Sequence, residues 1–222
     1  MEEYLNKIIC GDCLEVMKKL PDKCVDLVLT DPPYGIDIGK MNFTNSTTGG
    51  VCKRNDYKGK ADWDKTTPTK EYFDEIIRIS REQIIFGGNY FTEYLPSSGC
   101  WLVWDKRTDD KYSNDFADLE MAWTSFKKPS RIIRYLWSGM LQGNMKDKEK
   151  REHPTQKPVP VIKQILNKFS DANDTILDPF LGSGTTAVAA AQLGRNFIGI
   201  EISKEYCDIA EQRLKNLQPT LI

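Results

Sequence analysis

The segment TILDPFLGSGTTAVAAAQLGRNFIGIE, residues 175–201, decides the fold class of this 222-residue chain. Its first residues, Thr175 to Leu177, form a short apolar run that is typical of a buried strand. The alanine-rich stretch from Thr185 to Leu193 predicts a helix that ends at Gly194 as its C-terminal cap. Asn196 to Ile200 predicts a second buried strand. Together they form a βαβ unit, so the two strands are expected to be parallel.

The rest of the chain shows the same alternation of strands and helices. Further strands are predicted at residues 7–10, 25–30, 83–86, 101–104, 119–123 and 132–137. Further helices are predicted at 13–20, 67–80, 89–95 and 159–169, and from 203 to the end. We therefore expect an α/β fold: a doubly wound, mostly parallel, Rossmann-like sheet with helices on both faces. The length suits a single domain, 1–222, with two polar inserts at about 35–65 and 106–152.

The composition excludes several classes of protein. Hydrophobic residues make up 40% of the chain, which is enough for a packed core and argues against global disorder. The net charge of −1 argues against a partner held by bulk positive charge, such as a histone-like coat on DNA. The sequence contains no run of about 18 apolar residues, so no membrane span is predicted. The first residues do not resemble a signal peptide. We therefore expect a cytoplasmic protein with reduced cysteines.

Polar motifs follow five of the predicted strands. They are Gly11-Asp12, Asp31-Pro32-Pro33-Tyr34, Gly87-Gly88, Asp178-Pro179-Phe180 and Glu201. Ligands of parallel sheets bind at the carboxyl ends of the strands, so these motifs are expected to gather on one rim.

The stretch from Gly182 to Ala187 fits the glycine fingerprint GxGxxA, and Glu201 ends the next strand. Such glycines let a cofactor approach the backbone, and such an acid accepts hydrogen bonds from ribose hydroxyls. This pattern predicts a nucleoside cofactor, either NAD or S-adenosylmethionine. The chain has little room for a second mononucleotide-binding half, and Asp178 is well placed for an ammonium group. Both points favour S-adenosylmethionine.

Asp31-Pro32-Pro33-Tyr34 predicts a clamp for an amino group on a flat ring. The two prolines stiffen the turn and remove two N–H donors, so that only acceptors remain. Asp31 and the Pro32 carbonyl would accept the two amino protons and expose the nitrogen lone pair. Tyr34 would stack on the base, as aromatic side chains do for a base taken out of a duplex.

These motifs, in this order, resemble the permuted, β-class DNA amino-methyltransferases. Asp31–Tyr34 matches the catalytic DPPY, residues 178–185 match the cofactor motif, and His153-Pro-Thr-Gln-Lys-Pro158 matches the segment before it. The resemblance implies a circularly permuted, seven-stranded methyltransferase sheet and transfer of a methyl group from S-adenosylmethionine to N6 of a flipped-out adenine. The stretch Gly87–Phe91 is also similar to a phage or prophage subgroup, so a bacterial or phage origin is expected.

The resemblance assigns roles to individual positions. The catalytic residues implied are Asp31, Pro32, Pro33 and Tyr34. The cofactor-binding residues implied are Asp12, Cys13, Asp31, Thr155, Lys157, Asp178, Phe180, Gly182, Ser183, Gly184, Thr185, Glu201 and Ile202. His153 is expected to position its loop rather than to act as a base. No covalent intermediate is needed, so no cysteine has to be a nucleophile.

The two polar inserts carry the basic residues expected to hold double-stranded DNA. The positions chosen are Lys53, Arg54, Arg107, Arg131 and Arg134. No metal site is expected: Cys10 and Cys13 have CxxC spacing, but the chain has no second pair and His153 is its only histidine.

Several alternatives stay open at this point. The same chemistry on cytosine N4 is the first, and methylation of an amino group on RNA or protein is the second. A nicotinamide oxidoreductase would use the glycine fingerprint and Glu201 but leaves Asp31–Tyr34 unexplained, and a non-enzymatic binding module explains neither motif. The sequence does not decide between a monomer and a homodimer, or whether a cognate restriction endonuclease exists.

Overall fold

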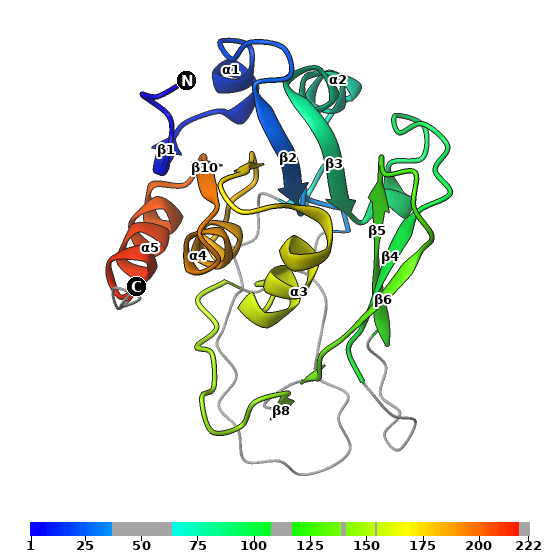
Figure 1. Cartoon of the computed structure of the whole chain (residues 1–222), viewed down its shortest axis with the longest axis vertical. Helices are drawn as coiled ribbons and strands as arrows, with labels where there is room; N and C mark the ends of the chain where they lie inside the picture. Colours follow the sequence, from blue (N-terminus) through cyan, green and yellow to red (C-terminus); the bar gives the residue numbers. More distant parts are fainter. Residues whose placement is uncertain (37–63, 108–116, 139–140, 154, 218–222) are drawn as a thin grey trace.

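The computed structural model describes residues 1–36, 64–107, 117–138, 141–153 and 155–217. Within them, eight strands form one sheet in the order β1-β10-β9-β2-β3-β5-β4-β6 (Figure 1). The strands are β1 (Lys7–Cys10), β2 (Val25–Thr30), β3 (Ser80–Phe86), β4 (Trp101–Asp105), β5 (Leu119–Thr124), β6 (Arg131–Arg134), β9 (Thr175–Asp178) and β10 (Asn196–Glu201). The expected α/β class is confirmed, with eight described strands in the sheet instead of the seven expected.

The sheet is parallel from β1 to β3 and changes direction only at β5. The pairs β1–β10, β10–β9, β9–β2 and β2–β3 are all parallel. β5 is antiparallel to both β3 and β4, whereas β6 is parallel to β4. The amino end of β5 therefore lies at the same edge of the sheet as the carboxyl ends of its neighbours.

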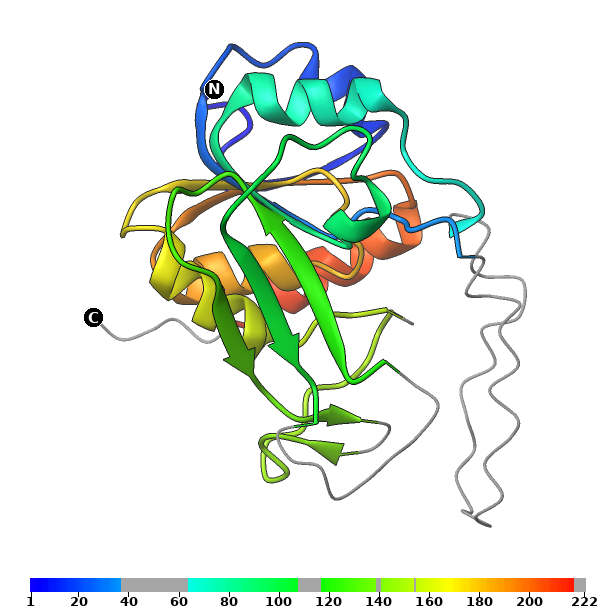
Figure 2. The same ribbon diagram turned by 90° about the vertical axis from the view of Figure 1, so that its right-hand side faces the viewer.

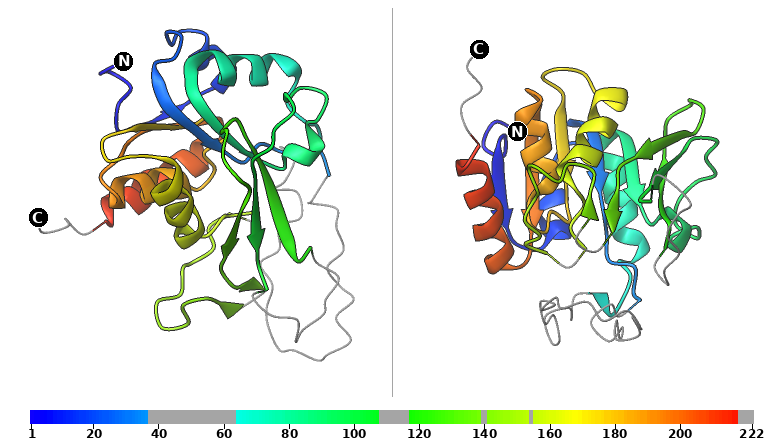
Figure 3. Two further views of the ribbon diagram at one scale, coloured as in Figure 1. Left: turned by 45° about the vertical axis from the view of Figure 1, so that its right-hand side comes forward. Right: turned by 90° about the horizontal axis from the view of Figure 1, so that it is seen from below.

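Helices cover the two faces of the sheet. α1 (Cys13–Met17) and α2 (Lys70–Ile79) lie on one face, and α3 (Val159–Phe169), α4 (Thr185–Gln192) and α5 (Lys204–Lys215) lie on the other (Figure 2). Figure 3 shows α3, α4 and α5 side by side along their face. In the described residues, no helix is long and apolar enough to cross a membrane.

Each face of the sheet has its own core, because successive strand residues point to opposite sides. On β2, Val28 packs with α1 and α2, in a core that includes Met17 and Phe73. Leu27 and Leu29 belong to the other core, against α3 and α4. These buried apolar strands are what holds the polar strand ends in place at the rim.

Several predicted elements differ from the structure. The helix expected at 13–20 ends at Met17, and the strand expected at 83–86 begins at Ser80. The strand expected at 132–137 ends at Arg134, and the chain then forms a separate hairpin of β7 (Trp137–Ser138) and β8 (Leu141–Gln142). The helix expected at 89–95 is a single turn, η3 (Gly88–Tyr90), and the helix expected from Thr67 begins at Lys70. Within the insert expected at about 106–152, β5 and β6 belong to the main sheet.

Candidate active site

The predicted rim is present in the structure. β1, β10, β9, β2 and β3 are parallel neighbours, so their carboxyl ends bring Asp12, Asp31, Gly87, Asp178 and Glu201 to one edge. Cys10 and Glu201 are register partners on β1 and β10, and Thr30 and Ile85 are partners on β2 and β3. The edge therefore carries both predicted sites, one on each side of β9.

The turn after β2 is held from two directions. The Tyr34 hydroxyl donates a hydrogen bond to Asp31 Oδ1 at 2.5 Å. The backbone N–H groups of Tyr34 and Gly35 both donate to Asp64 Oδ1, at 2.9 and 3.1 Å. Asp64 is buried, and it lies just before α2. The turn therefore presents Asp31 and Tyr34 in a fixed relation to each other.

The ring of Tyr34 packs against Gly87 and Tyr90. It stacks on the half-exposed ring of Tyr90, with centroids 4.9 Å apart and planes inclined by 13°. Gly87 has a φ of +67°, and a Cβ at this position would lie 2.1 Å from Tyr34 Cε1. Only a glycine accommodates both the left-handed backbone and the ring. Burial and the neighbouring Asp31 carboxylate raise the pKa of Tyr34 well above its ordinary value, so the hydroxyl stays protonated.

A partly buried line of alternating charges runs from Asp31 through Lys157 and Glu120 to Lys106, and Lys157 is its most buried member. Lys157 Nζ donates to Asp31 Oδ2 and lies 3.0 Å from Glu120 Oε2. Lys106 Nζ lies 2.5 Å from Glu120 Oε1. Two carboxylates and two ammonium groups balance in charge, as buried ions require.

The charges in this line shift one another's proton affinity. Burial raises the pKa of Asp31, and Lys157 only partly offsets that effect. Burial disfavours the charge on Lys157, but Asp31 and Glu120 outweigh it and raise the pKa of Lys157. Burial also opposes ionisation of Glu120, but Lys157 and Lys106 outweigh it and lower the pKa of Glu120. At neutral pH, Lys157 is therefore charged and its two carboxylate neighbours share it.

Asp178 is the buried acid at the end of β9, with 4% of its surface exposed. Its Oδ1 accepts hydrogen bonds from the Thr30 hydroxyl at 2.7 Å and from the Phe180 N–H at 3.1 Å. Burial raises the pKa of Asp178 to about 6. The acid is thus ionised at neutral pH, next to the glycine-containing turn.

Glu201 closes that turn from the end of β10. Its Oε2 accepts from the Gly182 N–H and its Oε1 from the Ser203 N–H, both at 2.8 Å. Gly184 begins α4, and a Cβ there would lie 2.6 Å from the Cβ of Ala210 on α5. Each carboxylate oxygen of Glu201 keeps a lone pair for a further donor.

These residues fit a nucleoside cofactor. Ile202, directly after Glu201, is 70% exposed and offers an apolar surface at the rim. Asp12 lies between β1 and α1. Its side chain caps α1 by accepting a hydrogen bond from the Leu14 N–H at 2.8 Å. Cys13 is buried beneath it, and burial raises the pKa of the thiol to about 12, so it is neither an anion nor a nucleophile. An acid for hydroxyl groups beside an exposed apolar side chain matches a ribose and its base.

The loop from His153 to Lys157 connects the two halves of the rim. His153 packs edge-on against Tyr206 of α5, with centroids 4.5 Å apart. Burial, with a contribution from Lys157, lowers the pKa of His153 to about 4, so the ring is neutral and its Nδ1 can accept from Thr155. Gln156 Oε1 accepts from the Ser183 hydroxyl at 3.1 Å and so attaches the loop to the glycine turn. The geometry agrees with a positioning role for His153.

The residues expected to contact DNA are spread over the structure. Lys53 and Arg54 lie outside the described residues. Arg107 pairs with Asp118 at 2.7 Å, close to the rim. Arg134, 3.5 Å from Asp105, is at the carboxyl end of β6 on the same edge, whereas Arg131 is at the amino end of that strand. Arg107 and Arg134 are thus nearer the site than Arg131.

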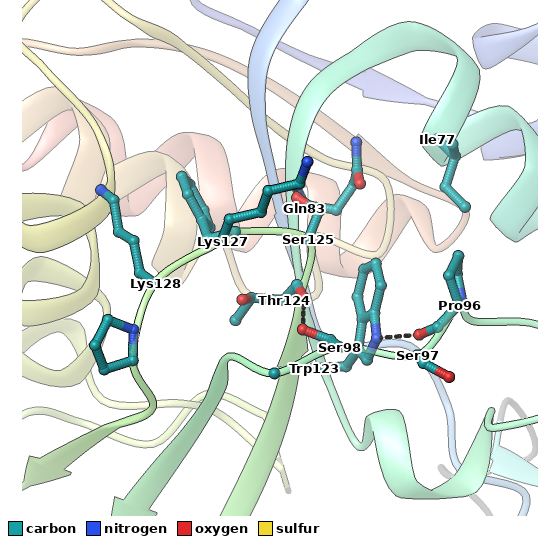
Figure 4. A pocket seen from close by; sticks show the side chains of 13 residues that line it. Ile77, Gln83, Pro96, Ser97, Ser98, Trp123, Thr124, Ser125, Lys127 and Lys128 are labelled. Atoms are coloured by element: carbon teal, nitrogen blue, oxygen red, sulfur yellow. Dashed lines mark hydrogen bonds between the residues drawn. The ribbon is translucent and has the colours of Figure 1, made fainter.

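A hollow lies at the opposite edge of the sheet from the rim (Figure 4). It has a volume of about 690 Å³ and is lined by the loops before β4 and after β5. Its walls are fixed by hydrogen bonds from Trp123 Nε1 to Pro96 O and from Ser98 Oγ to Thr124 O. Its lining contains Lys127 and Lys128 but no carboxylate, so it lacks the acceptor groups found at the rim. In the part of the chain that the structure describes, no cluster of three or more His, Cys, Asp or Glu side chains could hold a metal ion.

Three residues of the rim were not expected from the sequence: Asp64, Tyr90 and Glu120. Asp64 stands in a polar segment where nothing distinguishes it from its neighbours. Tyr90 was noted only as part of the stretch Gly87–Phe91. Glu120 had a usable signal, because it is the one charged residue of the strand LEMAWT.

The fold and the site together define a Rossmann-like methyltransferase, in which an acceptor turn lies beside a nucleoside-cofactor cradle. Comparison with known proteins narrows this class. The model of the N6_N4_Mtase family, described as DNA methylase, matches residues 97–212. The chain belongs to this family, and it is an S-adenosylmethionine-dependent DNA methyltransferase.

Individual relatives agree with this assignment. The chain is 31% identical to the Type II methyltransferase M.HinfI of Haemophilus influenzae, over 99% of this chain and 71% of that protein. It is 28% identical to the Type II methyltransferase M2.DpnII of Streptococcus pneumoniae, over 96% of this chain and 92% of that protein. The crystal structure of an M1.HpyAVI–SAM complex shares the fold, with a TM-score of 0.56 at 24% identity, over 95% of this chain and 99% of that one.

Proposed function

We propose that this enzyme transfers a methyl group from S-adenosylmethionine to the exocyclic N6 amino group of an adenine flipped out of double-stranded DNA. One observation carries the proposal: Asp31 and Asp178 end neighbouring strands, and Thr30 donates a hydrogen bond to Asp178 at 2.7 Å. An acceptor for an amino group and an acid for the cofactor thus lie side by side.

The acceptor turn would act on the nitrogen. An amino group on an aromatic ring is a poor nucleophile, because its lone pair is delocalised into the ring. Asp31 and the Pro32 carbonyl accept its two hydrogens and favour a geometry that exposes the lone pair. Pro33 stiffens the turn, and Tyr34 stacks on the base. In the free enzyme Asp31 Oδ1 already accepts from Tyr34, so the incoming amino group takes the place of that hydroxyl.

The second half of the rim would hold the cofactor. S-adenosylmethionine, when bound, supplies an electrophilic methyl group on a sulfonium ion. Asp178 pairs with its ammonium group, and Glu201 accepts from its ribose hydroxyls. The remaining residues assigned to this site are Asp12, Cys13, Thr155, Lys157, Phe180, Gly182, Ser183, Gly184, Thr185 and Ile202. Rate enhancement comes from orientation and from acceptors fixed in advance by the fold.

Adenine is preferred to cytosine because the turn reads Asp-Pro-Pro-Tyr, which in the family usually accompanies N6 chemistry. For DNA binding we assign Lys53, Arg54, Arg107, Arg131 and Arg134, with contacts to phosphates.

Nucleoside analysis tests the proposal. DNA treated with the enzyme is digested and its nucleosides are identified by mass spectrometry. N6-methyladenine is expected from the wild type, and none from Asp31→Ala, which should still bind S-adenosylmethionine. Asp171→Ala removes an exposed acid after α3 and should methylate like the wild type. N4-methylcytosine as the product, or full activity of Asp31→Ala, would overturn the proposal.

The setting of the enzyme follows from its relatives. The Type II methyltransferases among them suggest that it protects DNA in the cytoplasm against a cognate restriction endonuclease. An endonuclease that cuts only unmethylated copies of the target site would establish this. A homodimer is the assembly that the resemblance suggests, and analytical ultracentrifugation measures it directly.

A further inference from the structure

We propose that Glu120 is a positioning residue for the methyl transfer: it shares the ammonium group of Lys157, so that Asp31 remains a strong acceptor for the target amino group. This inference rests on the proposed function. Glu120 lies outside the predicted motifs, on β5, which runs antiparallel to β3 and β4.

The direction of β5 is what brings Glu120 to the site. β5 runs antiparallel to its neighbours, so its second residue lies at the edge where the other strands end. Glu120 is the register partner of Trp104, next to the end of β4. Its side chain is 21% exposed, which is low for a glutamate in a strand that otherwise carries no charge.

Glu120 makes contacts in two directions. Oε2 lies 3.0 Å from Lys157 Nζ, and Oε1 lies 2.5 Å from Lys106 Nζ. Lys157 itself is confined, because its Nζ also lies 5.0 Å from the centre of the Phe86 ring. Lys157 is therefore held between two carboxylates and a ring face and cannot turn entirely toward either acid.

This sharing matters for Asp31. A carboxylate fully paired with one ammonium group is a weaker acceptor for a third partner, because the ammonium already polarises its oxygens. With Glu120 present, the positive charge of Lys157 is divided. Without it, Asp31 is the only carboxylate within ion-pair distance of Lys157 among the described residues. The two would then close into a simple pair that competes with the substrate.

The charged and titratable groups that act on Asp31 come from four elements. Tyr34 is on its own turn, Lys157 precedes α3, Glu120 is on β5, and Asp178 ends β9. Glu120 repels the charge on Asp31 and raises the pKa of Asp31, whereas Lys157 lowers it. Lys106 acts on Glu120 and lowers the pKa of Glu120. Substitutions of Glu120 and Lys106 should therefore move the titration of Asp31 in opposite directions.

The test is the pH dependence of kcat for methylation by the full chain at saturating S-adenosylmethionine, where the effect of Asp178 on cofactor affinity does not set the acid limb. Glu120→Gln should lower kcat about ten- to hundredfold and change the KM for S-adenosylmethionine little. The acid limb of its pH profile should move down by about one unit, since a like charge near Asp31 has been removed. Glu120→Asp keeps the charge, so its acid limb should stay at the wild-type position even where kcat falls.

Two further variants complete the experiment. Lys106→Met leaves Glu120 in place without its outer cation, and the acid limb should move to higher pH. Glu82→Gln removes a half-buried acid at the other end of β3, whose side chain accepts from Ser125. This control should keep the wild-type profile.

The outcomes separate the two proposals. Acid limbs that stay in place in both Glu120→Gln and Lys106→Met, with only thermal stability reduced, would overturn the positioning role. If Glu120→Gln does not fold, the direction of the shift in Lys106→Met decides alone. A wild-type enzyme that methylates no adenine overturns the proposed function, whatever the variants do.

Discussion

Gly87→Ala tests whether the packing of Tyr34 is needed for catalysis. Gly87 has a φ of +67°, and an alanine in that region costs about 1–2 kcal/mol. The new Cβ would lie 2.1 Å from Tyr34 Cε1, whereas carbon atoms in contact lie about 3.5–4.0 Å apart. The ring therefore has to move by more than about 1 Å, which disturbs both its stacking on Tyr90 and its hydrogen bond to Asp31. A displacement of this size can cost about hundredfold in rate.

Gly194→Ala is the matched control. Gly194 has a φ of +68°, and nothing lies within 4 Å of the Cβ that a substitution would add. It carries the same backbone cost without a contact. Gly194→Ala should therefore lose about 2–8 °C in Tm, as expected for about 1–2 kcal/mol in a domain of this size. Gly87→Ala should lose more, because the contact with Tyr34 adds an overpacking cost of about 1–3 kcal/mol.

The assay is transfer of labelled methyl groups to DNA, together with calorimetric titration of S-adenosylmethionine. Gly87→Ala should lose about hundredfold in kcat and keep its affinity for the cofactor, because Asp178 and Glu201 are not disturbed. Gly194→Ala should keep both. If Gly87→Ala turned over as fast as Gly194→Ala, the position of Tyr34 against Gly87 would not matter for catalysis and the reasoning would be refuted.

Three further predictions concern charged residues. Burial raises the pKa of Asp178 to about 6. The affinity for S-adenosylmethionine should therefore fall about tenfold per pH unit as the pH drops below that value. An Asp178→Asn variant with the same pH dependence would contradict this. Lys157→Met leaves the largely buried carboxylates of Asp31 and Glu120 without their shared cation. This should cost up to about 3–5 kcal/mol of the free energy of unfolding, measured by urea titration. An unchanged midpoint would show that the ion pairs do not hold the loop. Arg134→Gln should weaken DNA binding, measured by fluorescence anisotropy. It should also reduce the slope of the logarithm of the binding constant against the logarithm of the salt concentration by about one. An unchanged slope would show that Arg134 does not contact a phosphate.

Most of the rim follows from the sequence, because parallel strands fix where their ends lie. The short, largely apolar runs at 25–30 and 175–177 predict buried strands of a parallel sheet, and whatever follows such strands lies at the carboxyl edge. This is why Asp31, Asp178 and Glu201 could be placed together although up to 170 residues separate them.

The other half of the sheet could not be predicted in the same way. Apolar strands such as 101–105 and 119–124 look alike whichever way they run, so periodicity does not reveal that β5 is antiparallel. The side chain of Glu120 therefore could not be assigned to the rim. The end of β6 at Arg134 is not evident from the sequence, because every residue from Ile132 to Trp137 other than Arg134 itself is apolar or aromatic.

Asp64 has a consequence for how the specificity of this enzyme can change over evolution. Its carboxylate accepts hydrogen bonds from the N–H groups of Tyr34 and Gly35. These bonds connect the end of the catalytic turn to the residue where the described chain resumes before α2. The free-energy cost of lengthening a segment whose ends are already joined grows only slowly with its length. The stretch between Gly35 and Asp64 can therefore lose, gain or exchange residues while the catalytic turn keeps its shape. The proposed DNA contacts Lys53 and Arg54 stand in that interval, so under the proposed function new target sites could be acquired there without rebuilding the chemistry beside it.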